Sequence, residues 1–251
     1  MTHKETVRMV DGAKTAVLFM HGICGTPDHF RELLALEELV PQDWSLYNIV
    51  LDGHCKKVED FGRSSMKKWK TQVQSVFDSL CATHEKVVIV GHSMGTLFSI
   101  QLALRRSEKV PFIFLIASPL FVRVRPHAVG YMLRIAFDRV KLSDPVQVAM
   151  RHACGMETTN KLWKYTTWLP RMVELLQECS ETRKCLPALR VPCIAWQSEK
   201  DELVSNRSRK FLVNCGNVQV HNLLHSTHFY YSPEDAELVL RSFQDACKEY
   251  R

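Results

Sequence analysis

The sequence predicts an α/β fold with a mostly parallel sheet, and two observations indicate it. Short apolar runs recur along the 251 residues, and most are followed by a segment with helical spacing. Because these runs are apolar throughout, we expect them to be strands of a sheet that helices cover on both faces. The second observation is the motif Gly-His-Ser-Met-Gly at 91–95, which joins a strand-like run at 86–90 to a helix-like run at 96–105.

The expected elements alternate along most of the chain. Pro27 and Asp28 are typical of a helix start, and so are Pro233 and Glu234. Functional side chains are expected at the carboxyl ends of the strands. The sequence predicts strands at 15–20, 44–51, 86–90, 111–116, 191–197 and 218–224, and helices at 27–39, 66–83, 96–105, 206–213 and 233–248.

The composition indicates one soluble domain. A chain of 251 residues with 46% hydrophobic residues can bury a sizeable core. The nine cysteines include no C-x-x-C pair, so we expect core thiols in a reducing cytoplasm rather than disulfides or a zinc site. The first five residues are charged and polar, which argues against a signal peptide, and no apolar run is long enough to span a membrane. We therefore expect a cytoplasmic monomer or dimer without stable membrane insertion.

Ser93 is the expected nucleophile. In a G-x-S-x-G motif between a strand and a helix, the serine occupies a sharp turn at the carboxyl edge of the sheet, and the flanking Gly91 and Gly95 permit that turn. The amides that open the helix can then face a developing negative charge. A short Gly/Ser turn also matches the pattern by chance, so the strand before it and the helix after it decide the assignment.

A serine is a weak nucleophile at neutral pH, so this assignment requires an acid and then a histidine later in the chain. Asp201, on the loop after a late strand, is the expected acid. Glu199 and Glu202 are alternatives, although for both glutamates we favour solvated loop charges. His228, beyond one more strand, is the expected base, and His225 is the alternative.

Two backbone amides are expected to bind the oxyanion of a tetrahedral intermediate. One belongs to Met94, the residue after the nucleophile. The other belongs to Ile23, in the loop that follows the first strand and begins with His21 and Gly22. A plain turn between strand and helix would have the same geometry, so the functional interpretation of this loop depends on Ser93.

Together these residues resemble the α/β-hydrolase family. Within it, the chain is most similar to the small bacterial carboxylesterases that include monoacylglycerol lipases, from about residue 14 to the C-terminus and least between 119 and 186. Two positions depart from the family pattern, namely Cys55, where a glycine is common, and Thr227, where a glycine often precedes the catalytic histidine. The resemblance rests on His21 and Gly22, the motif at 91–95, Asp201, His228, and the stretches 51–54, 117–119 and 197–202.

The resemblance implies an α/β-hydrolase fold whose core spans 1–118 and 187–251, with a helical cap inserted at 119–186 after the strand that follows the nucleophile helix. It also implies a serine hydrolase that cleaves short- to medium-chain carboxylic esters, with monoacylglycerols as one candidate, through an acyl-enzyme and without a metal or organic cofactor. Acyl transfer by the same residues is one alternative. A ligand-binding protein with negligible turnover is another.

Segment 119–186 interrupts the alternation and is expected to be all helical. Most of its apolar stripes are expected to pack the cap against the core, while a subset, with Phe121, Met132 and Trp163 as candidates, lines an acyl-binding slot. Six basic and two acidic residues between 119 and 156 leave four of the six net positive charges there (six minus two). A solvated face is the simpler explanation, and attraction to an anionic substrate or lipid surface is the alternative. We expect no nucleic-acid binding, because no recognisable motif accompanies these charges.

Overall fold

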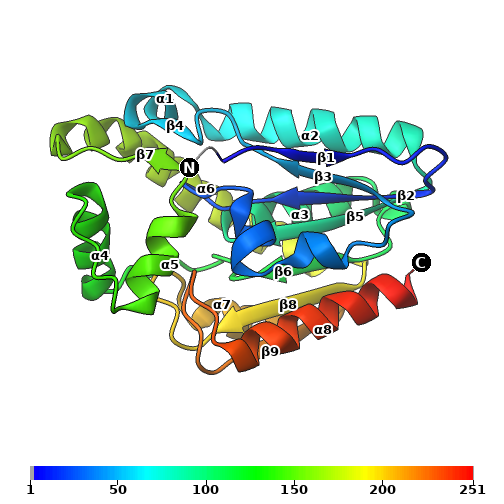
Figure 1. Ribbon diagram of the computed structural model, residues 1–251. Helices are drawn as coiled ribbons and strands as arrows, with labels where there is room; N and C mark the ends of the chain where they lie inside the picture. The colour runs from blue at the N-terminus through cyan, green and yellow to red at the C-terminus, as the bar shows by residue number, and fades with distance from the viewer. Residues whose placement is uncertain (1–2, 251) are drawn as a thin grey trace.

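Seven strands form the main sheet of the computed structural model, which describes residues 3–250 (Figure 1). Their order is β1-β3-β2-β5-β6-β8-β9, and every neighbouring pair is parallel except β1 with β3. The predicted mostly parallel α/β sheet is therefore confirmed. The strands are β1 (Thr6–Arg8), β2 (Thr15–Met20), β3 (Ser45–Ile49), β5 (Lys86–His92), β6 (Ile113–Ile116), β8 (Cys193–Ser198) and β9 (Val218–Leu223).

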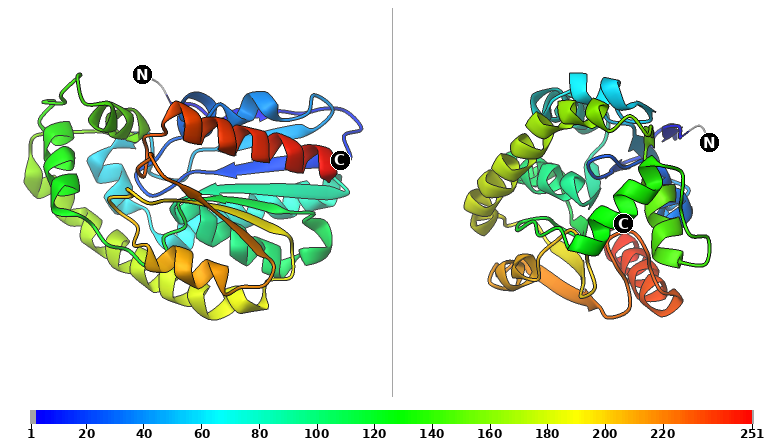
Figure 2. Two further views of the ribbon diagram at one scale, coloured as in Figure 1. Left: turned by 90° about the horizontal axis from the view of Figure 1, so that it is seen from below. Right: turned by 90° about the vertical axis from the view of Figure 1, so that its left-hand side faces the viewer.

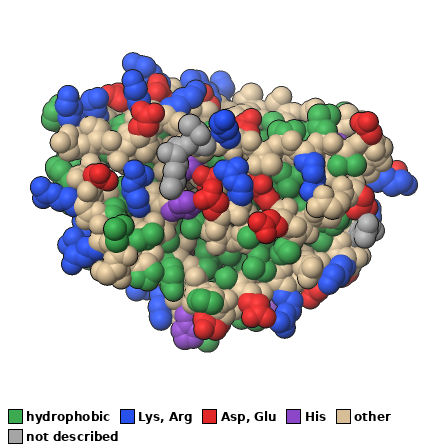
Figure 3. Space-filling model, in the orientation of Figure 1, with side chains coloured by type: hydrophobic (Ala, Val, Ile, Leu, Met, Phe, Trp, Pro, Cys, Tyr) green, Lys and Arg blue, Asp and Glu red, His purple; other side chains and the backbone are tan. Residues whose placement is uncertain are grey.

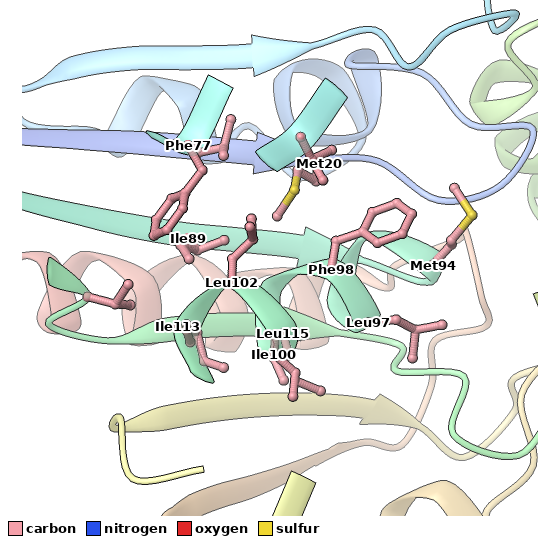
Figure 4. Close-up of a cluster of buried hydrophobic side chains, with 14 of the residues drawn as sticks. Met20, Phe77, Ile89, Met94, Leu97, Phe98, Ile100, Leu102, Ile113 and Leu115 are labelled. Carbon is pink, nitrogen blue, oxygen red and sulfur yellow. The ribbon is translucent and has the colours of Figure 1, made fainter. Parts of the chain in front are cut away.

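Alternate residues of each strand face opposite layers of helices. In β2, Leu18 belongs to one buried hydrophobic cluster and Phe19 to the other. Figure 4 shows the first cluster, where Phe77 and Leu102 meet the sheet. The second cluster includes Phe243 of α8, and Figure 2 shows α8 on the opposite side of the sheet from α6 and α7. The helices are α2 (Met66–Thr83), α3 (Met94–Arg105), α6 (Leu169–Cys185), α7 (Arg207–Val213) and α8 (Pro233–Glu249).

Residues 27–39 differ from the sequence prediction. They form a π-helical turn, η1 (His29–Leu33), and a 3-10 turn, η2 (Leu36–Leu39), instead of one continuous helix. Between the turns, Ala35 has a φ of +47°, a left-handed conformation that an α-helix cannot contain. The prediction also lacks the short elements β1, β4 (Lys56–Lys57) and α1 (Val58–Arg63) and the single turns η3 (Ser107–Lys109) and η5 (Leu186–Ala188).

Residues 119–168 lie beyond the carboxyl ends of the strands, on the left of Figure 1, whereas α6 runs along one side of the sheet and packs on α3. The expectation of an all-helical segment is wrong at β7, which pairs in parallel with β4 of the core. None of the helices in residues 3–250 has the length and apolarity to cross a membrane. Besides α6, the segment contains α4 (Pro126–Ala136), α5 (Pro145–Ala153), β7 (Met156–Glu157) and η4 (Leu162–Trp168).

Candidate active site

Ser93 alone forms the turn between β5 and α3. Its φ of +51° and ψ of −123° are strained for a residue with a side chain, and its N–H donates to the Ile116 carbonyl over 2.9 Å. Both motif glycines are required by packing. A Cβ at Gly91 would lie 2.5 Å from the Ser99 Oγ, and one at Gly95 would overlap the Met20 carbonyl. The turn holds Ser93 at the carboxyl edge of the sheet, where it is 7% exposed.

Asp201 and His228 form a buried hydrogen-bonded pair. The His228 Nδ1 lies 2.8 Å from the Asp201 Oδ2, and each side chain is only 2% exposed. The Asp201 Oδ1 accepts from the N–H groups of Leu203 and Val204, which fixes the carboxylate. Burial lowers the pKa of His228, but the charge and hydrogen bond of Asp201 and the charge of Glu202 raise it, so its pKa lies above that of a free histidine.

Glu202 contradicts the expectation of a solvated loop charge. It is 1% exposed, and its Oε2 accepts from the His228 N–H over 3.0 Å. Burial, the largest cause, raises the pKa of this carboxyl group. Glu199, in contrast, is exposed and accepts a hydrogen bond from Asn222, as expected for a loop charge. No sequence pattern distinguishes the two glutamates, because the burial of Glu202 depends on tertiary packing next to His228.

His225 lies apart from this pair. It is exposed, and its backbone N–H donates to the Asp235 Oδ2 over 2.8 Å. The same carboxylate oxygen accepts from the Ser226 hydroxyl. The structure thus joins His228, and not His225, to Asp201.

The loop that begins with His21 contacts the Ser93 turn. A Cβ on Gly22 would lie 2.7 Å from the Ser93 Cβ, so only glycine allows this approach. The Ile23 N–H donates to no acceptor among the described residues. Met94 is the first residue of α3, so its N–H has no acceptor within the helix. Both expected oxyanion donors therefore have a free N–H next to or near Ser93.

Two buried histidines fix the conformation of this loop. The His21 Nδ1 donates to the Gly22 carbonyl over 2.8 Å, and its Nε2 accepts from the Leu51 N–H over 3.1 Å. The His54 Nε2 accepts from the Cys24 N–H over 3.1 Å. Burial lowers the pKa of His21 to about 4 and that of His54 well below the usual range, so both rings are neutral acceptors at neutral pH. In the sequence, residues 51–54 stand out only as a stretch that resembles the α/β-hydrolase family, and nothing indicates that His54 holds the loop.

A further pair of buried histidines, His29 and His92, lies next to His228. No sequence pattern predicted this pair either. The rings of His29 and His92 stack with centroids 3.6 Å apart. The His92 Nε2 donates to the His228 carbonyl over 3.1 Å, and His29 hydrogen-bonds the Tyr231 hydroxyl. Burial lowers the pKa of both stacked rings well below the usual range. Within residues 3–250, no group of three His, Cys, Asp or Glu side chains is arranged to hold a metal ion.

A protein-family model described as serine aminopeptidase, S33, matches residues 11–230. The chain belongs to this family. Its fold is accordingly that of an α/β hydrolase, as the resemblance implied. None of the curated proteins matches this hydrolase by sequence.

Solved structures of other hydrolases share the fold over nearly the whole chain. A structure from work on the metagenome-derived lipolytic enzymes LipS and LipT superposes with a TM-score of 0.74 at 17% identity, covering 99% of this chain and 98% of that one. The monoacylglycerol lipase of Paleococcus ferrophilus has a TM-score of 0.66 at 15% identity, covering 99% of both chains. A carboxylesterase structure from Nitrososphaera gargenis has a TM-score of 0.68 at 16% identity, covering 98% and 95%. At these identities the likeness shows the fold.

The three expected substrate-binding residues of the hydrolase lie in different surroundings. Met132 on α4 and Trp163 on η4 are 42% and 67% exposed. Phe121 instead packs under the guanidinium groups of Arg183 and Arg207, each 4.6 Å from its ring centroid. Among the described residues, no hydrogen bond or ring contact joins these three side chains to Ser93. Figure 3 shows Lys and Arg side chains beside hydrophobic ones at the end of the molecule that contains α4 and η4.

Proposed function

We propose that the protein is a serine hydrolase that cleaves carboxylic esters through an acyl-enzyme. The observation that best supports this function is the buried hydrogen bond between Asp201 and His228, at the same sheet edge as the strained Ser93 turn. A carboxylate on Nδ1 selects the tautomer whose Nε2 carries a lone pair, which is the form that can remove a proton from a serine hydroxyl.

The proposed reaction has two stages. The Ser93 Oγ attacks the ester carbonyl while the His228 Nε2 takes the hydroxyl proton, and the amides of Ile23 and Met94 stabilise the oxyanion. The protonated His228 then gives its proton to the leaving alcohol. A water molecule, activated by the same nitrogen, hydrolyses the acyl-enzyme and returns Ser93 to its starting form. Asp201 stabilises the imidazolium in both stages.

The proposed substrates are short- to medium-chain acyl esters, with monoacylglycerols among them. Support comes from the fold shared with lipolytic enzymes, and the roles proposed above for Ser93, Asp201 and His228 are those that ester cleavage requires. We further propose that segment 119–186 forms a cap and that Met132 and Trp163 contact the acyl chain. For Phe121, whose ring lies beside the guanidinium groups of Arg183 and Arg207, contact with the acyl chain stays a prediction.

Substitution of Ser93 tests the central assignment. Ser93→Ala should leave a folded protein whose hydrolysis of p-nitrophenyl butyrate is about 10⁶-fold slower, as when the serine of a protease triad is lost. A serine-directed organophosphate should label Ser93 in the unmodified protein, as mass spectrometry of the labelled peptide would report. His228→Ala should be severely impaired, whereas the matched variant His225→Ala should keep most of its activity. Near-normal hydrolysis by purified Ser93→Ala would contradict the proposal that Ser93 is the nucleophile.

A further inference from the structure

A cavity lies between α6, α7 and the chain that leads into α4, and it is lined by none of Ser93, Asp201 and His228. Its volume is about 360 Å³, within the range of small-molecule pockets. In the left view of Figure 2, α6 and α7 lie on the same side of the sheet. Three arginines, Arg123, Arg183 and Arg207, line the cavity, together with Val122, Leu176 and Ser205.

The three arginines have no carboxylate partner. Among the described residues, no Asp or Glu oxygen lies within 4 Å of their guanidinium nitrogens. Glu178, which belongs to the same helix as Arg183, pairs with Lys70 instead. Arg183 donates to the Leu120 carbonyl, which is neutral. The cavity therefore combines three positive charges with no negative charge from the protein.

The Phe121 ring contacts two of these charged groups without neutralising them. The guanidinium carbons of Arg183 and Arg207 lie 4.6 Å from its centroid, and Phe211 packs against the same ring. An aromatic face attracts a cation through its quadrupole, but it carries no net charge. Both guanidinium groups thus keep their full positive charge, and an anion in the cavity would be attracted by them and by Arg123.

We propose that this cavity binds a small molecule that carries a phosphate group. The planar guanidinium fork matches phosphate oxygens in bidentate geometry, and charge-assisted hydrogen bonds of this kind are the strongest that side chains make. The Ser205 hydroxyl in the same lining supplies a further donor.

The site is joined to the loop that holds Asp201. The Ser205 N–H donates to the Phe121 carbonyl over 2.8 Å, and the Arg123 N–H donates to the Leu203 carbonyl over 2.9 Å. Val122 and Val204 form an isolated antiparallel bridge between the same two stretches. A phosphate ligand that orders residues 121–123 would therefore stabilise residues 203–205 as well. The proposal itself concerns binding and does not depend on the proposed ester hydrolysis.

Calorimetric titration tests the proposal directly. Inorganic phosphate and glycerol 3-phosphate are each titrated into the full chain at an ionic strength held constant with sodium chloride. The test variant is Arg123→Ala/Arg207→Ala, in which both side chains are exposed. The control is Lys184→Ala/Lys210→Ala, which removes the same charge from exposed positions on α6 and α7 that do not line the cavity.

We expect the unmodified protein and the control to bind at least one of the two compounds, with the test variant at least tenfold weaker. Tighter binding of glycerol 3-phosphate would identify a phosphate ester as the ligand, and tighter binding of inorganic phosphate would identify the free anion. Absence of binding to the unmodified protein, undiminished binding to the test variant, or an equal loss in the control would each overturn the proposal. Thermal unfolding verifies that the variants are folded. If the double variant does not fold, the single variant Arg207→Ala takes its place.

Discussion

At the scale of single residues, the contact between Gly22 and Ser93 leaves no room for a side chain on the glycine. The loop can approach the turn only because Gly22 has no side chain, since a Cβ would lie 2.7 Å from the Ser93 Cβ and 3.3 Å from its Oγ. The two neutral histidines, His21 and His54, hold the loop through hydrogen bonds to Gly22, Cys24 and Leu51. The proposed oxyanion donor, the Ile23 N–H, is therefore placed by contacts on both sides of it.

Gly22→Ala should therefore impair catalysis. The added methyl group would displace the loop or Ser93, and loss of one oxyanion donor costs about 10²- to 10³-fold in kcat. The control is Gly130→Ala in α4, where a Cβ would meet nothing within 4 Å. Because alanine favours a helix over glycine by about 0.5–1 kcal/mol, the control should keep its activity and gain slightly in melting temperature. Unchanged kcat in Gly22→Ala would contradict the proposed role of this loop.

Glu202 should affect the pH dependence of the reaction. Its charge raises the pKa of His228, and the base must be neutral to accept the Ser93 proton, so activity is lost as the pH falls through that pKa. Glu202→Gln removes the charge but keeps an oxygen for the His228 N–H. The pKa of His228 should then fall, and the acidic limb of kcat/KM should move to lower pH. Glu199→Gln, an exposed position, should leave the limb in place, and an unmoved limb in Glu202→Gln would refute the effect.

At the scale of elements, segment 119–186 is attached to the core beside the proposed oxyanion loop. The short strands β4 and β7 pair in parallel, and directly before β7 the Gly155 N–H donates to the Cys24 carbonyl over 2.8 Å. A Cβ on Gly155 would overlap the Gly25 carbonyl. Farther along, the Trp168 Nε1 donates to the Val58 carbonyl at the start of α1. The attachment thus holds the middle of the segment against the loop 21–25 while α4 remains largely exposed.

The proposed cap should set the acyl chain-length preference. Each buried methylene contributes about 0.8 kcal/mol, so kcat/KM should rise by up to roughly fourfold per methylene until the slot is full, in a series of p-nitrophenyl acetate, butyrate, hexanoate and octanoate. Met132→Ala and Trp163→Ala should move the optimum. Because both side chains are substantially exposed, neither substitution should lower the melting temperature much. A flat profile would exclude the lipid-ester substrates without affecting the assignment of Ser93.

Sequence patterns predicted the elements whose stability is local. The helix at 66–83 begins and ends as expected, because Ser65 caps it by accepting the Lys68 N–H and its apolar residues keep helical spacing. The pattern misled at 27–39, where Pro27 and Asp28 indicated the start of a helix but Ala35 adopts a left-handed conformation. The strand β1 was not predicted, since its three residues depend on pairing with β3 rather than on any local preference.

At the scale of the whole molecule, the candidate site also combines features that the order of residues predicts with features that depend on tertiary contacts. Chain order selected Asp201 and His228, and the fold brings them within hydrogen-bond distance. Burial of Glu202 and the stacking of His29 on His92 arise from contacts between residues far apart in the chain, so no local pattern could indicate them. Residues with the same side chain, such as Glu199 and Glu202, become distinguishable only after tertiary packing.

Most thiols of the native protein should react slowly with a thiol reagent. All nine cysteines are free, and burial raises the pKa of several, to about 12 for Cys55, Cys179 and Cys247. Because the thiolate is the reactive form, Ellman's reagent should titrate few thiols quickly in buffer at pH 8 and all nine after unfolding in guanidinium. The absorbance of the released thionitrobenzoate gives both counts. Rapid reaction of most of the nine in the native state would contradict the described burial.

The antiparallel strand β1 also affects how this protein can associate with itself. An open sheet has unpaired backbone groups at both outer strands, and a long apolar outer strand can recruit another chain and start aggregation. Here one outer strand, β1, has only three residues, and Arg8 at its end donates to the Pro41 carbonyl. The other, β9, includes the polar residues Gln219, His221 and Asn222. Neither outer strand therefore offers a long apolar edge on which the sheet could extend from one molecule to the next.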